Sequence, residues 1–133
     1  EGMLWKFGAD CFRAFSAGTN PKPVHPNAIK AMKEIGIDIS AQVSKSIDRF
    51  LNDRFDVVIT VCDRANERCP VFPCDVKRIH WSFDDPAEAV GTEQERMRVF
   101  RRVRNEIKER INVYLSEEKG QSRTQVQIDN YCC

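Results

Sequence analysis

Two cysteines that enclose a short loop with two arginines are the residues of this sequence best suited to chemistry. Cys62 and Cys69 lie seven positions apart, and Arg64 and Arg68 stand between them. Two thiols on a loop can form a disulfide when the loop folds back, and nearby guanidinium groups stabilise the reactive thiolate. The spacing therefore favours a redox pair. The alternative is two small, half-buried side chains that only fill space.

Two other chemistries fit the same stretch less well. Both thiols together with Cys74 and His80 make four ligands for zinc, but the C-x-x-C spacing usual in structural zinc sites is absent. Cys62 to Arg68 also satisfies C-x5-R, the pattern in which backbone amides and an arginine hold an oxyanion around a thiolate. That loop contains no glycine and runs into a proline, so the match in spacing is weak evidence for an oxyanion-binding loop.

A pair of carboxylates before a proline is the second candidate. Asp84 and Asp85 precede Pro86, so one of them can be held over a site as a general acid that protonates a leaving oxygen. The alternative is an ordinary turn and N-cap before the last helix. His25 precedes Pro26 and His80 precedes Trp81, and we interpret both histidines as structural.

The elements that must position these residues follow from hydrophobic periodicity. The continuous β-branched run at residues 57–61 is typical of a parallel strand buried on both faces, and Cys62 follows it directly, where open α/β sheets bind ligands. We expect an α/β fold with three layers, in which a parallel sheet is flanked by helices. The remaining elements are a helix end over 1–7, strands over 11–17 and 76–81, helices over 26–35 and 92–117, and a short helix near 47–51.

Composition narrows the functional classes. Among 133 residues, 21 Lys and Arg face 20 Asp and Glu, which leaves a formal net charge of +1 and disfavours nucleic acid as a partner. No apolar run approaches the roughly 20 residues of a membrane span, and no signal peptide pattern begins the chain. We therefore expect a cytoplasmic protein without a membrane partner, with one core made by its 41% hydrophobic residues.

The chain resembles the thioredoxin-coupled arsenate reductases, which have the low-molecular-weight protein tyrosine phosphatase fold. The resemblance rests on residues 15–19 (FSAGT), 25–40 (HPNAIKAMKEIGIDIS), 56–62 (DVVITVC) with Cys69-Pro70, and 80–87 (HWSFDDPA). It extends from residue 1 to about 117, so we predict an α/β domain over 1–119 and a flexible tail over 120–133.

The resemblance implies reduction of arsenate to arsenite. In that family a cysteine of an N-terminal C-x5-R loop attacks arsenate, a second cysteine attacks the arseno-thiolate and releases arsenite, and a third closes a disulfide that thioredoxin reduces. By position, Cys62 matches the second cysteine, Cys69 the third and Asp85 the general acid. The resemblance implies no cofactor, and its substrate is arsenate or a phosphate-like oxyanion.

The start of the chain departs from the family pattern. Glu1 and Gly2 match the helix just after the oxyanion loop, so the first strand and the nucleophilic cysteine would lie upstream. The explanations are a truncated chain, an inert relative, or replacement of the strand by residues 126–133, which alternate weakly and end in Cys132-Cys133. Packing of this tail away from the strand at 57–61 would exclude the replacement.

A second departure concerns metal binding. Some family members bind an alkali cation, and Glu1 and Ser16 fall at ligand-like positions, but Lys45 stands where an acidic ligand is expected. We therefore expect the ammonium group to take the place of the cation and predict no bound metal. Two other functions remain open: a tyrosine phosphatase of the same fold, which needs only Asp85 of these residues, and a protein that binds metalloids through cysteine pairs without turnover.

Overall fold

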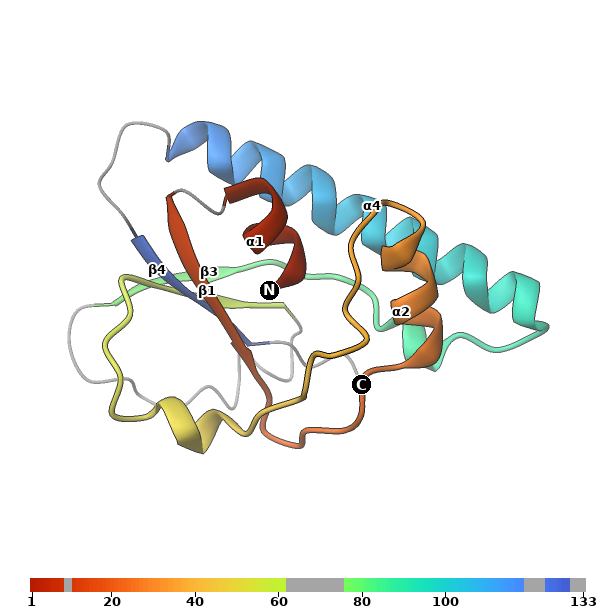
Figure 1. The fold of residues 1–133 in the computed structure, drawn as a ribbon, viewed down its shortest axis with the longest axis horizontal. Coiled ribbons are helices and arrows are strands. Elements are labelled where there is room, and N and C mark those ends of the chain that lie inside the picture. Colours follow the sequence, from red (N-terminus) through yellow and green to blue (C-terminus); the bar gives the residue numbers. More distant parts are fainter. Residues whose placement is uncertain (9–10, 62–75, 119–123, 130–133) are drawn as a thin grey trace.

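A four-stranded parallel sheet with helices on both faces forms the fold (Figure 1). The computed structural model describes residues 1–8, 11–61, 76–118 and 124–129. The strands are β1 (Phe12–Ala17), β2 (Val57–Thr60), β3 (Lys77–His80) and β4 (Thr124–Asp129), in the spatial order β1-β4-β2-β3. Helices α1 (Gly2–Gly8), α2 (Pro26–Lys33) and α4 (Glu93–Glu117) cover one face, and the 3-10 helix η1 (Ile47–Phe50) covers the other. The predicted three-layer α/β fold is confirmed.

Strand β2 separates two parts of the hydrophobic core. Val57 and Ile59 pack with α1 and α4 on one face, whereas Val58 packs with η1 on the other. All four residues of β2 are buried, as the unbroken β-branched run predicts. Because side chains of a strand alternate between faces, both layers of the molecule depend on this short strand.

The helix boundaries agree with the capping signals of the sequence. Thr92 and Glu95 form a capping box at the start of α4, in which each side chain accepts a hydrogen bond from the backbone of the other. His25 caps α2 with its imidazole, which confirms its structural interpretation, and Pro26 occupies the first turn. The turn after α2 contains Gly36 at φ +76°, a conformation that favours glycine.

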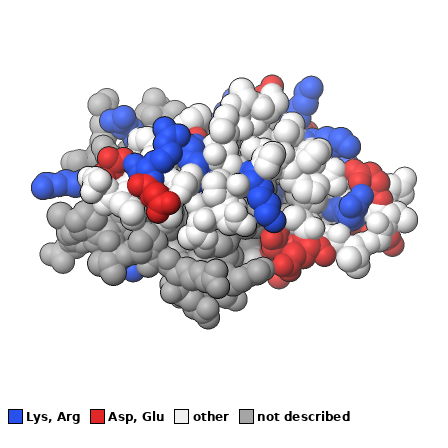
Figure 2. Space-filling model, turned by 90° about the horizontal axis from the view of Figure 1, so that it is seen from below, with Lys and Arg blue, Asp and Glu red and all other residues white. Residues whose placement is uncertain are grey.

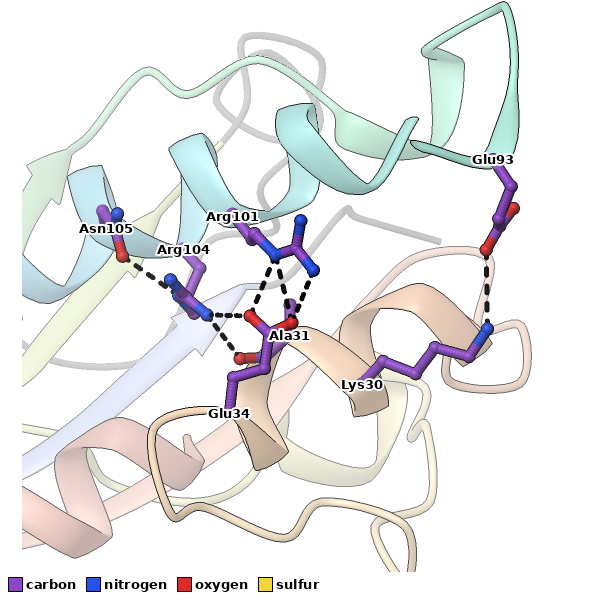
Figure 3. Close-up of polar contacts among 7 residues, drawn as sticks. All are labelled: Lys30, Ala31, Glu34, Glu93, Arg101, Arg104 and Asn105. Atoms are coloured by element: carbon purple, nitrogen blue, oxygen red, sulfur yellow. Dashed lines mark hydrogen bonds and ion pairs between the residues drawn. The ribbon is translucent and has the colours of Figure 1, made fainter. Parts of the chain in front are cut away.

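An ion-pair network holds α2 against α4 (Figure 3). The Glu34 carboxylate accepts hydrogen bonds from Arg101 at 2.7–3.0 Å and from Arg104 at 2.8 Å. Arg104 also donates to the carbonyl of Ala31 at 2.7 Å. The bond to Arg101 is the first cause of the lowered pKa of Glu34. The network fixes the register between two helices that join mainly through Ala31, Met97 and Phe100.

Strand β4 occupies the centre of the sheet although it comes last in the sequence. It pairs in parallel with β1 on one side and with β2 on the other. The partners of Gln127, for example, are Phe15 and Val58. Without β4, the facing edges of β1 and β2 would carry unpaired backbone groups inside the sheet.

This placement differs from the flexible tail that we predicted for residues 120–133. The six residues of β4 lie between β1 and β2, against the strand at 57–61, so the packing that would exclude the replacement is not found there. The sequence signal was weak because alternation over a few residues does not reveal that two distant strands leave a space between them. The other residues of the tail lie outside the described residues.

Proline in β4 should unfold the sheet. We expect Gln127→Pro to lower the free energy of unfolding by about 3 kcal/mol or more, because proline removes a ladder donor from a strand paired on both sides. Glu93→Pro is the control, because the first helical position has no helical partner for its N–H. Equal urea midpoints for Gln127→Pro and the unsubstituted protein would show that β4 does not hold the sheet together.

Candidate functional site at the carboxyl edge of the sheet

All four strands end on one row of residues. Ala17 pairs with Asp129, Asp129 with Thr60, and Thr60 with His80. We call these four residues the terminal row. Because the strands are parallel, every segment that follows a strand leaves the sheet at this edge, which is where α/β sheets place their ligands.

The loop after β3 is anchored beside the residue that precedes Cys62. The Trp81 N–H donates to the carbonyl of Thr60 at 2.8 Å, and the Phe83 N–H donates to the carbonyl of Val61 at 3.4 Å. Trp81 itself is buried and packs against Tyr114. Cys62 and Cys69, both candidate site residues, lie outside the described residues, and so do Arg64, Arg68 and Cys74.

The two aspartates of the loop have separate partners. Asp85 caps the short 3-10 helix η2 (Pro86–Glu88), with its Oδ1 accepting from the Ala87 N–H at 2.9 Å. Asp84 bonds to Arg102 at 2.8 Å. The alternative interpretation, a turn with an N-cap, is thus confirmed for Asp85. The helix that Asp85 caps is η2, however, whereas Thr92 caps the last helix. Among the described residues, only one oxygen of Asp85 has a partner, and the general-acid role of Asp85 stays a prediction.

His80 belongs to the terminal row and contacts its neighbour there. Its Nδ1 lies 2.8 Å from the hydroxyl oxygen of Thr60, which is buried. The sequence did not point to this bond, because only the register of β2 and β3 makes the two residues neighbours. Within the described ranges, no group of three or more His, Cys, Asp or Glu side chains could hold a metal ion.

A buried carboxylate and a lysine meet next to the end of β1. The Glu1 side chain, 6% exposed, accepts hydrogen bonds from the Ser16 hydroxyl and from Lys45, whose Nζ lies 3.1 Å away. The Lys45 ammonium also lies 3.4 Å from the Val43 carbonyl. Among the described residues, two oxygen atoms therefore contact this ammonium group, and its role in place of a cation stays a prediction.

A groove that the sequence did not reveal opens beside this pair. It has a volume of about 630 Å³ and lies between the first residues of α1 and the segment 36–49. Six of its lining residues, which define the basic groove, are Gly2, Trp5, Lys6, Val43, Lys45 and Arg49. No sequence motif joins them, because residues from distant segments come together only when α1 packs beside the loop.

Elsewhere the charges are mixed. Figure 2 shows a face on which Lys and Arg are interspersed with Asp and Glu and separated by uncharged residues. A broad basic surface is the usual footprint of a nucleic-acid-binding protein, and this face does not have one. The described part of the chain also has no helix long and apolar enough to cross a membrane.

Comparison with known proteins identifies the family. The profile of the family described as "Low molecular weight phosphotyrosine protein phosphatase" matches residues 2–126. The chain belongs to this family.

Within it, the chain is similar to proteins named arsenate reductase. The one from Halalkalibacterium halodurans is 49% identical over 119 residues, which are 90% of this chain and 86% of that protein. The one from Bacillus subtilis is 45% identical over 119 residues, which again are 90% of this chain and 86% of that protein. A solved structure described as "An arsenate reductase in oxidized state" superposes with a TM-score of 0.72 at 34% identity and covers 88% of this chain and 85% of that one.

Removing the Lys45 ammonium should destabilise the protein. We expect Lys45→Met to lower the free energy of unfolding by about 1–3 kcal/mol, because the buried Glu1 carboxylate loses a charged donor. Lys45→Arg, which keeps the charge, should recover most of the loss.

The prediction that no alkali cation binds beside Glu1 has its own test. The unsubstituted protein is unfolded with urea in potassium chloride and in choline chloride of equal ionic strength, and we expect equal midpoints. A higher midpoint in potassium chloride would contradict this prediction.

Proposed function

We propose that this protein reduces arsenate to arsenite through a relay of cysteine thiols that ends in a Cys62–Cys69 disulfide, which thioredoxin reduces. The names of its relatives support arsenate as the substrate. Its membership of a phosphatase family supports a tetrahedral oxyanion as the ligand.

One observation carries the assignment of residues to this chemistry. The loop that bears Asp85 is hydrogen-bonded to the backbone of Thr60 and Val61, and Cys62 is the next residue in the sequence. Asp85 and Cys62 thus belong to segments that leave the sheet at adjacent points of one edge. An acid and a thiol that act on the same oxyanion must lie on segments that leave the sheet close to each other.

The proposed electron balance is that of a two-electron reduction. A first thiolate forms a sulfur–arsenic bond and displaces one oxygen of arsenate, which leaves as water once it is protonated. The Cys62 thiolate then attacks that sulfur, and the electron pair of the broken bond reduces arsenic to the trivalent state of arsenite. Cys69 attacks the Cys62 sulfur, frees the first thiol and closes the disulfide, and the dithiol of thioredoxin returns both residues to thiols.

The first thiol has two candidate sources. One is a segment that precedes Glu1 in a longer chain, as in the family pattern. The other is Cys132-Cys133, which follow β4 in the sequence three and four residues after Asp129 of the terminal row. The central position of β4 supports the second source, because the segment after β4 starts at the same edge as the segment after β2.

The proposed role of Asp85 is to protonate the departing oxygen. Its bond to the Ala87 N–H restricts the carboxyl group, and Pro86 stiffens the same turn. A general acid must be held in place in this way to act in the transition state. Asp84, paired with Arg102 on the surface, is the natural comparison.

The disulfide is the first feature to test. After oxidation with diamide, we expect peptide mapping by mass spectrometry to find a Cys62–Cys69 bridge that thioredoxin, its reductase and NADPH reduce. Cys69→Ser should abolish the bridge, and Cys11→Ser should leave it intact, because Cys11 is an exposed free thiol. Free thiols at both positions after oxidation would refute the relay.

Arsenite release tests the relay during turnover. With arsenate and the thioredoxin system, we expect Cys62→Ser to abolish arsenite release and Cys69→Ser to stop it after one turnover. Full activity in both variants would contradict the proposal. Hydrolysis of an aryl phosphate that survives both substitutions would indicate the phosphatase alternative.

Replacing the carboxyl group should separate acid catalysis from capping. We expect Asp85→Asn to lower kcat for arsenate about 10²–10⁴-fold, since the amide still caps η2 but cannot supply the proton. Asp84→Asn should change kcat less than about 2-fold, because an exposed ion pair contributes little. Equal kcat values in the two variants would remove Asp85 from the mechanism.

A further inference from the structure

We propose that the basic groove docks an acidic, partly apolar segment of the dithiol protein that reduces the Cys62–Cys69 disulfide. This inference rests on the proposed function and adds a recognition surface to it. The argument uses the charges of the groove, its exposed apolar groups, and its position relative to the terminal row.

The groove has more free cations than free carboxylates. Of its two carboxylates, Glu1 pairs with Lys45, whereas the exposed Asp38 accepts only from the Ser40 N–H at 2.9 Å and keeps its negative charge. Lys6 and Arg49 are exposed and have no partner among the described residues. Among the described residues, two unpaired positive charges therefore stand against the single unpaired carboxylate of Asp38, and this excess of positive charge favours a partner with carboxylates.

The groove also offers apolar contact. Trp5 is 49% exposed, and its indole N–H is already bonded to the carbonyl of Ala14 at 2.9 Å. Its ring is therefore available for apolar contact without an unsatisfied donor. Val43, 73% exposed, lies on the opposite wall. Exposed aromatic and arginine side chains around one groove, here Trp5 and Arg49, are typical of protein interfaces.

The position of the groove suits a partner that must reach Cys62. Ser16, which bonds to Glu1, lies one residue before the terminal row, and Gly18 bridges to Ser46. β1 is separated from β2 by β4 alone, so the two strands are about 10 Å apart. An interface of ordinary size covers about 800 Å² on each partner, a radius of roughly 16 Å. A reductase protein docked over the end of β2 would therefore also cover the end of β1, beside which Glu1 and Lys45 line the groove.

A protein segment fits this groove better than a small oxyanion does. Lys6 and Arg49 stand on exposed positions of α1 and η1, where water screens a single bound ion. A partner surface excludes that water and contacts Trp5 and Val43 at the same time.

Charge reversal of the groove tests the docking. The experiment starts from the protein with its Cys62–Cys69 disulfide preformed and measures the rate of reduction by thioredoxin and, separately, by dithiothreitol. We expect Lys6→Glu with Arg49→Glu to slow reduction by thioredoxin about 10-fold or more at low ionic strength and to weaken its salt dependence. The rate with dithiothreitol should not change, because this small reductant needs no docking surface.

A matched double variant controls for net charge. Arg54→Glu with Arg98→Glu makes the same change in charge at two exposed positions outside the groove and should leave both rates unchanged. If thioredoxin reduces the groove variant and the control equally fast, or if dithiothreitol slows as well, the docking proposal is wrong. If no disulfide forms in the unsubstituted protein, the proposed function itself fails. A raised KM for arsenate with an unchanged thioredoxin rate would assign the groove to the oxyanion instead.

Discussion

The parallel pairing of β4 with both β1 and β2 is the constraint on which the rest of the structure depends. Two strands from the first half of the chain leave a space one strand wide, and backbone groups inside a sheet cannot stay unpaired without a large cost in free energy. A segment from the end of the chain satisfies both edges at once. Because both β1 and β2 contribute to the core on each face, the pairing also determines how α1 and α4 on one face are placed relative to η1 on the other.

The same pairing organises the functional edge. It aligns Ala17, Asp129, Thr60 and His80 in one row, so the segments after four strands leave the sheet at one level. The cysteine loop, the loop with Asp85 and the last residues of the chain all begin there in the sequence. Residues from three distant segments can therefore serve one reaction without any long loop crossing the sheet.

Helix packing provides the rigidity that such an edge requires. Helix α4 packs against the sheet through Ile111 and Tyr114 and against α2 through the network of Glu34 with Arg101 and Arg104. Its Arg102 binds Asp84, which ties the loop of Asp85 to the helix. The loop is thus hydrogen-bonded onto β2 at one end, whereas its exposed ion pair with α4 contributes little to its rigidity.

The sequence by itself determined the local elements and the family motifs. The β-branched run of β2, the capping box at Thr92 and Glu95, and the stop at Gly36 depend on neighbours within a few residues, so their positions were predictable. The turn at Asp85 was also predictable, because it depends on the adjacent Pro86 and Ala87, whereas the general-acid role of Asp85 stays a prediction. Only the tertiary structure decided the place of β4, the contact of His80 with Thr60, and the basic groove. Each of these depends on strand register or helix packing between segments far apart in the chain, and such pairings leave no periodic signal in the sequence.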